Sequence, residues 1–238
     1  MNQRVAMIVT SQARMGDSQH PTGFWAEELA CPYYQFRDAG LEVVMASPSG
    51  GPAPIDPASL KPQEQNDAAV ERFLADPTAQ TQIAHTVPCG ELDAAQFDAV
   101  FFVGGHGTMW DFPGNPQVQA IVETACAHGK LVATLCHGAA ALVSARQPNG
   151  QALVDGRRIS AFSDAEEAAV GLSQVVPFAL ESRLRELGAQ VVVAPHWQAC
   201  VVCDGPFISG QNPQSSLAVA HASSVVGRVR FGVHRELP

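Results

Sequence analysis

Short apolar runs alternate along the chain with longer stretches in which apolar residues recur at helical spacing. The short runs predict strands at residues 5–9, 41–46, 99–103, 131–135, 158–161, 191–194, 200–203 and 207–209. The longer stretches predict helices at residues 24–39, 67–74, 92–97, 116–127, 136–144 and 214–226. Because strands and helices alternate, we expect an α/β fold with a mostly parallel sheet and helices on both of its faces.

Turn residues and breakers complete this pattern. Asp204 and Gly205 separate the last two strands and predict a hairpin. Residues 47–57 are rich in Pro and Gly and predict a surface loop. The chain has 238 residues without an internal repeat, so we expect one domain over residues 1–238.

Composition and charge narrow the partners and the compartment. The formal net charge of −9 argues against nucleic acid or an anionic membrane surface as a partner. The first apolar run is too short for a signal segment or a membrane span, so we expect a cytoplasmic protein. Six cysteines without a secretion signal are expected to be reduced. Cys200 and Cys203 form a CxxC pair on a predicted strand, where their side chains face opposite sides, and we interpret the pair as structural.

Cys136 stands at the point where the apolar run 131–135 stops and a stretch of small residues begins. The pattern is typical of a strand, a sharp turn and a helix. At the first turn of a helix, unpaired N–H groups and the positive end of the dipole favour a thiolate, so Cys136 is a candidate nucleophile. A buried cysteine that only fills space fits the same position. Both interpretations stay open at this residue taken alone.

Other candidate site residues are expected at the same edge of the sheet, where the carboxyl ends of its strands meet. In the Gly-Gly-His-Gly turn at 104–107, Gly105 could offer its N–H, together with that of His137, as an oxyanion hole, and His106 would border the substrate. One of the acids Glu27 and Glu28 should face inward, and the spacing favours Glu28. Each signal is weak alone, because such an acidic pair is usually a solvated helix face.

His137 could act as the base for the thiol, and a base of this kind needs a third group to orient it. Asp164, Glu166 and Glu167 supply acidic candidates after the next predicted strand. The same residues also fit a helix start, with Ser163 or Asp164 as the N-cap and the two glutamates in the first turn.

Eight segments in this order resemble the ThiJ/PfpI superfamily, which has a class I glutamine amidotransferase-like fold. More narrowly, they are similar to glutathione-independent glyoxalases (glyoxalase III), which are also described as holding chaperones and deglycases. The segments are residues 22–32, 46–51, 54–57, 104–108, 136–138, 162–167, 176–178 and 210–213. The resemblance covers nearly the whole chain.

The resemblance implies a fold and a reaction. The implied fold is a flavodoxin-like three-layer sandwich with a nucleophile elbow, assembled as a homodimer. Cys136 would be the nucleophile, His137 its neighbour in the triad, Glu167 the triad acid and Glu28 the carboxyl beside the thiol. The implied enzyme is a lyase or hydratase that needs no cofactor. It would convert a small reactive aldehyde, methylglyoxal, to lactate through a hemithioacetal on Cys136 and an enediol.

The protonation state of Glu28 follows from its place beside the thiol. An ionised carboxylate there would raise the pKa of Cys136, so we expect Glu28 to be protonated, to donate to the sulfur and to titrate with it as a unit. His106, His137 and Glu28 could lie close enough to bind an ion. Because no metal-ligand spacing such as HExxH is present, no metal is expected to be required.

Several alternatives remain at the level of the sequence. A glutaminase-type amidotransferase would use Cys136 with His234 and Glu236, but these lie where chain ends usually fray, and Thr134 replaces the glycine of that elbow. A protease is a further member of the superfamily. A non-enzymatic stress chaperone or a cysteine redox sensor would use the same exposed thiol without turnover, although a sensor needs no triad acid.

Overall fold

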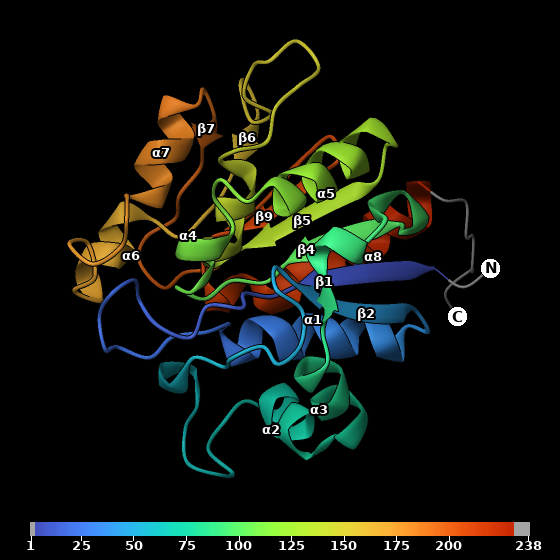
Figure 1. Cartoon of the computed structure of the whole chain (residues 1–238), viewed down its shortest axis with the longest axis vertical. Helices are drawn as coiled ribbons and strands as arrows, with labels where there is room; N and C mark the ends of the chain where they lie inside the picture. Colours follow the sequence, from blue (N-terminus) through green and yellow to red (C-terminus); the bar gives the residue numbers. More distant parts are fainter. Residues whose placement is uncertain (1–2, 231–238) are drawn as a thin grey trace.

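The protein is described over residues 3–230 by a computed structural model, shown in Figure 1. Its main sheet has the strand order β3-β2-β1-β4-β5-β9-β8. All neighbouring strands are parallel except β8, which runs antiparallel to β9. The strands are β1 (Arg4–Ile8), β2 (Glu42–Ser47), β3 (Val87–Pro88), β4 (Ala99–Phe102), β5 (Leu131–Leu135), β8 (Val201–Asp204) and β9 (Phe207–Gly210).

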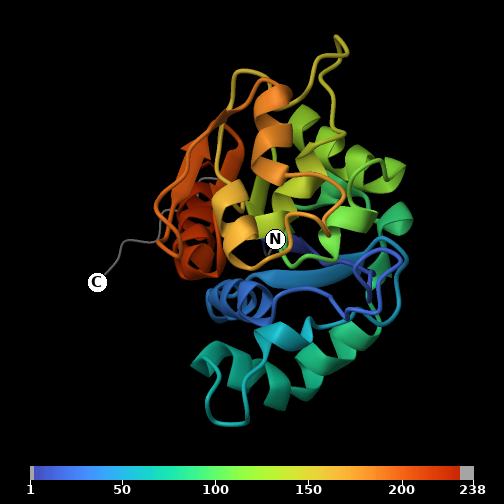
Figure 2. The same cartoon turned by 90° about the vertical axis from the view of Figure 1, so that its left-hand side faces the viewer.

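Helices cover both faces of this sheet. On one face, α1 (Ala26–Asp38) packs on α8 (Ser216–Arg230), and α2 (Ala68–Ala75) with α3 (Pro77–Ala84) lies on the outer side of α1 (Figures 1 and 2). On the other face lie α4 (Thr108–Asp111), α5 (Pro116–Ala127) and the 3-10 segment Cys136–Leu142. This arrangement confirms the predicted α/β sandwich of three layers.

The core is divided by the sheet, as strand geometry requires. Successive side chains of a strand point to opposite faces, so Met7 packs with the α1 and α8 side, whereas Ile8 packs with the α5 side. Both are fully buried. The central strands β4 and β5 are buried along their whole length, which explains why they appear in the sequence as continuous apolar runs.

Local signals fix the helix that the sequence predicted best. The Asn115 side chain accepts hydrogen bonds from the N–H groups of Gln117 and Val118, and Pro116 takes the first helical position of α5. Gly129 follows the helix with a φ of +64°. The predicted bounds 116–127 and 131–135 therefore agree with α5 and β5.

Four parts of the chain differ from the prediction. The predicted strands 158–161 and 191–194 shrink to β6 (Arg158–Ile159) and β7 (Gln190–Val191), which pair with each other in a separate sheet. The predicted helix 92–97 is replaced by 3-10 turns at Cys89–Glu91 and Ala94–Gln96. The segment after Cys136 is a 3-10 helix, wedged so closely against β4 that a Cβ on Gly138 would overlap the Phe102 carbonyl. The helices α3, α4 and α7 (Leu180–Glu186) were not predicted, and α6 (Asp164–Ala169) was anticipated only as a possible helix start at Ser163 or Asp164.

The strand order places a crevice at the carboxyl ends of β1 and β4. These neighbours lead to helices on opposite faces of the sheet, α1 after β1 and α4 with α5 after β4. In open α/β sheets, ligands bind where such connections diverge. β5, which pairs with β4, ends at the same edge, directly before Cys136.

Candidate active site

Cys136 occupies a sharp turn between β5 and the following 3-10 segment. Its φ of +56° lies in the left-handed region, which costs a residue with a Cβ about 1–2 kcal/mol. Its side chain is 4 % exposed. The backbone therefore turns abruptly enough to hold the thiol at the edge of the sheet, and such strain is typical of functional sites.

A chain of polar contacts runs from Cys136 to Glu167. Sγ of Cys136 lies 3.3 Å from Nδ1 of His137, and Nε2 of His137 lies 2.8 Å from a carboxylate oxygen of Glu167. A carboxylate only accepts, so Nε2 of His137 donates to Glu167, and Nδ1 is left as an acceptor for the thiol. The predicted triad residues are thus brought together, with the imidazole in the tautomer that a base requires.

Glu167 holds a second imidazole. Its other oxygen accepts a hydrogen bond from Nε2 of His106 at 2.9 Å. The two histidine rings lie with their centroids 4.1 Å apart, and Phe162 packs against both. The sequence placed His106 at the site, but it gave no sign that one carboxylate would orient both histidines.

These contacts fix the charges on this side of the thiol. Burial alone would raise the pKa of Glu167, but the hydrogen bonds from His106 and His137 hold it well below its usual range. Burial and the neighbouring His106 lower the pKa of His137 to about 4. At neutral pH, Glu167 is therefore ionised and His137 is an uncharged base.

Glu28 lies on the other side of the thiol, in the first turn of α1. Its side chain is completely buried, whereas Glu27 is partly exposed, as the spacing predicted. Among the described residues, neither oxygen of Glu28 completes a hydrogen bond of ordinary geometry. Gly104 permits the approach, because a Cβ there would overlap an oxygen of Glu28 and the Cβ of Cys136.

Burial raises the pKa of Glu28 to about 8, and the nearby Cys136 thiol and Gly104 N–H only partly offset it. Burial, followed by the charge that Glu28 would carry, also raises the pKa of Cys136 well above its usual value. At neutral pH the carboxyl and the thiol therefore both keep their protons. The protonated state predicted for Glu28 agrees with this environment.

A small cavity with apolar walls opens onto these groups. It has a volume of about 120 Å³, and Cys136, His137, His106 and Gly105 line it. The remaining walls are apolar, namely Trp25, Phe162, Val170, Trp197 and Pro213. Gly105 has a φ of +116° and no room for a Cβ beside the Gly23 carbonyl. The oxyanion role of the Gly105 and His137 N–H groups stays a prediction.

Trp197 was not recognised as a site residue from the sequence, whereas Glu166 was one of the acidic candidates. Trp197 has a φ of +60°, and its N–H donates to Glu166, which also accepts from the side chains of Gln211 and Asn212. Glu166 forms a capping box with Ser163, so the helix-start interpretation was right for this acid. The two adjacent glutamates thus divide their tasks. Glu166 fixes a wall of the cavity, and Glu167 orients the histidines.

A possible metal-ligand set lies in the same place. One ligand atom each from His106, His137 and Glu167 falls within 4.8 Å of the others, whereas the sequence suggested Glu28 as the third ligand. Since Glu167 already accepts a hydrogen bond from Nε2 of each histidine, an ion held through these atoms would have to displace both bonds. The expectation that no metal is required stays a prediction.

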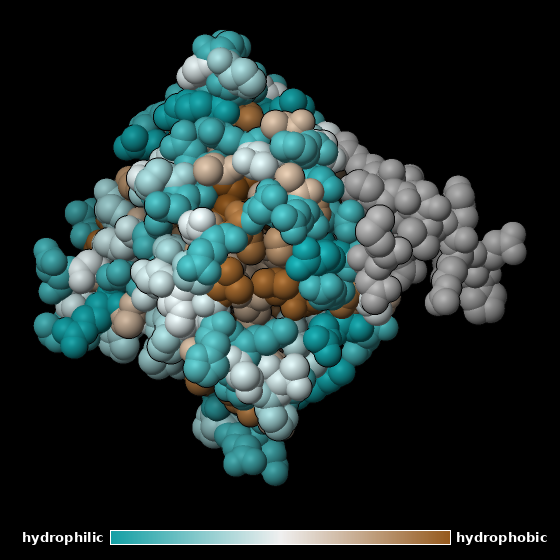
Figure 3. All heavy atoms as spheres, turned by 45° about the vertical axis from the view of Figure 1, so that its right-hand side comes forward, coloured by the Kyte–Doolittle hydropathy of each residue, from teal (hydrophilic) through white to brown (hydrophobic). Residues whose placement is uncertain are grey.

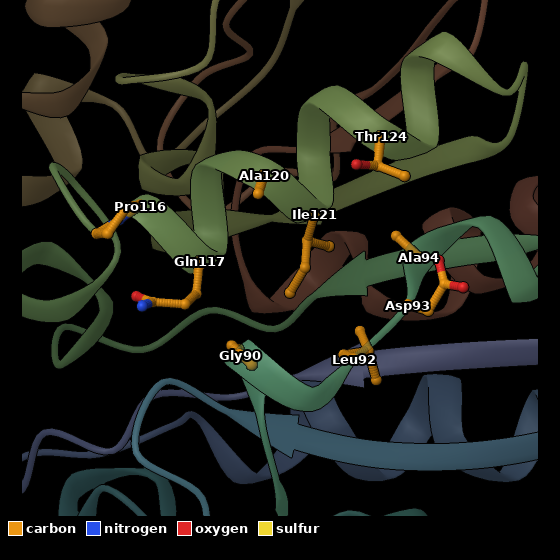
Figure 4. A pocket seen from close by; sticks show the side chains of 10 residues that line it. Gly90, Leu92, Asp93, Ala94, Pro116, Gln117, Ala120, Ile121 and Thr124 are labelled. Atoms are coloured by element: carbon orange, nitrogen blue, oxygen red, sulfur yellow. The ribbon is translucent and has the colours of Figure 1, made fainter.

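Other hollows of the described surface do not contain these groups. Figure 3 shows a face on which hydrophobic side chains gather in a central hollow with hydrophilic residues around it. One hollow, of about 240 Å³, lies between α5 and residues 89–94, and Figure 4 shows Gln117 and Ile121 pointing from α5 toward Gly90 and Leu92. A second, of about 590 Å³, lies along another side of α5. The cavity at Cys136 is therefore identified as the site by the reactive groups that line it, and not by its volume.

Three further expectations can be compared with the structure. All six cysteines are free, and Cys200 and Cys203 do not form a disulfide. His234 and Glu236, on which the glutaminase alternative depends, lie outside the described residues. Across residues 3–230, no helix combines the length and the apolar character that a membrane span requires.

Comparison with known proteins gives one consistent result. The model of the DJ-1/PfpI family matches residues 21–223. The glutathione-independent glyoxalase hsp3101 of Schizosaccharomyces pombe is 28% identical over 216 residues, which cover 87% of this chain and 88% of that protein.

Solved structures agree with the sequence comparison. The structure of Rapid Encystment Protein 24 KDa (REP24) of Francisella tularensis superposes with a TM-score of 0.90 at 38% identity and covers 94% of this chain and 99% of that one. Glyoxalase III of Candida albicans superposes with a TM-score of 0.86 at 26% identity over 94% of this chain and 96% of that one.

Proposed function

Because this chain belongs to the DJ-1/PfpI family, we propose that it is a glutathione-independent glyoxalase that converts methylglyoxal to lactate at Cys136. The observation that carries the proposal is the hydrogen-bonded chain Cys136–His137–Glu167 beside a protonated Glu28. A thiol with a base, an orienting acid and a separate proton donor suits addition to an aldehyde.

The first step forms the hemithioacetal. The sulfur of Cys136 attacks the aldehyde carbon while its proton passes to Nδ1 of His137, 3.3 Å away. The Glu167 carboxylate stabilises the imidazolium that results. The thiol needs this assistance, since its pKa is raised and little thiolate is present beforehand.

Glu28 acts as a proton donor in this step. Its carboxyl is protonated below pH 8 and lies beside the sulfur, where it donates to the oxygen anion that develops on the aldehyde carbon. If it were ionised, its charge would oppose the oxyanion and the thiolate alike. The N–H groups of Gly105 and His137 complete the anion site in this proposal.

The second stage moves hydrogen within the substrate. A base removes the proton from C1 of the hemithioacetal, and the electron pair forms the C1–C2 double bond of an enediol. Return of a proton to C2 gives a lactoyl thioester, and water releases lactate and the thiol. C1 is oxidised and C2 is reduced, so no external oxidant, reductant or cofactor is consumed.

The cavity favours a small substrate. Its volume of about 120 Å³ and its apolar walls suit a short 2-oxoaldehyde and exclude a bulky one. We include in the proposal the homodimer and the cytoplasmic location that the family resemblance implies. Sedimentation of the purified protein tests the first, and fractionation of cells tests the second.

Lactate formation from methylglyoxal without glutathione tests the proposal. The wild-type protein should make lactate, Cys136→Ser should not, and Cys203→Ser, which changes an exposed thiol, should match the wild type. Failure of the wild type to form lactate would overturn the glyoxalase proposal. Release of amine from glycated peptides would then support a deglycase, and oxidation of Cys136 without any turnover would support a sensor.

A further inference from the structure

We propose that His106 is a second catalytic base, which carries the proton from C1 to C2 of the substrate while His137 serves the thiol. The inference rests on the proposed glyoxalase function and names the group that performs its second stage. It follows from the way in which one carboxylate, Glu167, holds two imidazoles.

Glu167 fixes the same tautomer in both rings. Each oxygen of its carboxylate accepts from one Nε2, at 2.9 Å for His106 and 2.8 Å for His137. Since the pKa of Glu167 is held low by these bonds, the carboxylate stays an acceptor and both hydrogens stay on Nε2. A neutral ring in this tautomer offers its Nδ1 as a base.

The two Nδ1 atoms have different surroundings. Nδ1 of His137 faces Sγ of Cys136 and is committed to the thiol. Nδ1 of His106 has no hydrogen-bond partner among the described residues, and it is not one of their buried, unpartnered polar atoms. The atom is therefore accessible, and His106 is one of the residues that line the cavity. A base without a protein partner remains for the substrate.

Position and burial suit proton transfer between adjacent carbons. His106, His137 and Cys136 line one cavity of about 120 Å³, so a substrate attached to the sulfur has to lie beside His106. The His106 side chain is only 10% exposed and packs against His137 and Phe162. A proton taken up there is shielded from bulk water and can be returned to the neighbouring carbon.

The step balances within the substrate. Nδ1 of His106 takes the C1 proton, and the C1–H electrons form the C1–C2 double bond of the enediol as the C2 oxygen takes the proton that His137 received from the thiol. The imidazolium of His106 then delivers its proton to C2, and the hydroxyl on C1 returns a proton to the Glu28 carboxylate as the thioester carbonyl forms. His106 returns to its neutral form, and Glu167 stabilises its transient charge as it does for His137.

The test compares His106→Gln with the wild type. The glutamine amide can still donate to Glu167 but has no basic nitrogen, so the scaffold of the site is kept. The control is His85→Gln, which changes an exposed histidine directly after the last residue of α3. Lactate formation, alkylation of Cys136 by iodoacetamide and the isotope effect with methylglyoxal deuterated at C1 are measured on all three proteins.

We expect His106→Gln to lower kcat by about 100-fold or more, the range for loss of a general base. Alkylation of Cys136 should stay within about threefold of wild type, because the His137–Cys136 pair is untouched. The deuterium isotope effect on kcat should increase, because C1–H cleavage becomes rate-limiting. A structural loss of the site would not produce this combination.

Two results would overturn the inference. If His106→Gln kept kcat within about threefold of a lactate-forming wild type, another base would move the proton. If alkylation and turnover fell in parallel with no change in the isotope effect, His106 would only position Glu167 and His137. Absence of lactate from the wild type would instead overturn the glyoxalase function itself, and with it the role of His106.

Discussion

Glu28 and Glu167 are both buried acids in the first turn of a helix, and they flank the same thiol, yet their surroundings favour opposite charges. Glu28 has no completed hydrogen bond among the described residues, and burial raises its pKa to about 8. Glu167 accepts from two histidines, which outweigh the effect of burial and keep its pKa low.

Burial favours the uncharged form of both carboxyls, and the hydrogen bonds that only Glu167 accepts from two histidines reverse this effect for Glu167. Two acids whose pKa values are pushed apart can serve as a proton donor and as an electrostatic support in one site. The Cys136–His137 pair lies between them, so in the proposed reaction the thiol proton moves to His137 and the Glu28 proton remains for the substrate oxygen.

Removing the charge of Glu167 should have the largest effect. In Glu167→Gln the amide no longer requires a hydrogen on Nε2 of both histidines, so the tautomers mix and the imidazolium loses its support. We expect kcat to fall by about 10³-fold or more. Steady-state lactate formation checks this, with Glu186→Gln at an exposed glutamate as the control. Activity within tenfold of wild type would deny Glu167 an orienting role.

Glu28→Gln should have the next largest effect and should separate two properties. Gln is neutral, as Glu28 is, so alkylation of the thiol by iodoacetamide should be retained. Gln cannot release a proton, so kcat should fall by about 10²-fold. Full turnover in this variant would show that Glu28 does not act as the donor.

The pH dependence sharpens the same comparison. Activity should fall as pH decreases through about 4, where His137 becomes protonated, and as pH increases through about 8, where Glu28 loses its proton. On each limb, kcat/KM should change by up to about tenfold per pH unit. The residual activity of Glu28→Gln should lack the alkaline limb near pH 8. An unchanged limb in that variant would assign it to another group.

The smallest effect on activity is expected at Thr22, in the segment that leads into α1. The Thr22 hydroxyl donates to the Asp56 carboxylate at 2.9 Å, and both are buried where the chain enters α1. Thr22→Val leaves that oxygen without its partner, which should destabilise the protein by about 1–3 kcal/mol and lower kcat only a few-fold. Thermal unfolding and lactate assays check this against Thr81→Val on the exposed face of α3. An unfolding temperature equal to that of the wild type would show that this contact does not stabilise the segment before α1.

Much of this arrangement could be predicted from local patterns. The apolar runs of β4 and β5, the Asn115–Pro116 start of α5 and the turn at Cys136 are local signals, and the structure follows them. The inward position of Glu28 follows from helical spacing in the same way. Asp76 and Pro77 form a similar start signal for α3, although this helix was not predicted.

The rest depends on contacts between distant residues. Glu167 is 61 residues from His106 and 30 from His137, so no spacing could show that it joins them. Trp197 lines the cavity, and its N–H donates a hydrogen bond to Glu166, which is 31 residues away in the sequence. The pairing of β6 with β7 is likewise determined by tertiary contacts, since strands of two residues have no alternation of apolar and polar residues that could predict them.

The left-handed backbone of Cys136 has a consequence for the stability of the whole protein. Any side chain at this position keeps the fold under strain, and only glycine relieves it. The free energy of unfolding of Cys136→Gly, measured by thermal unfolding, should therefore exceed that of Cys136→Ala by about 1 kcal/mol, although both variants lack the thiol. The strain therefore lowers thermal stability at the proposed nucleophile, and selection for heat tolerance alone would tend to replace Cys136 by glycine.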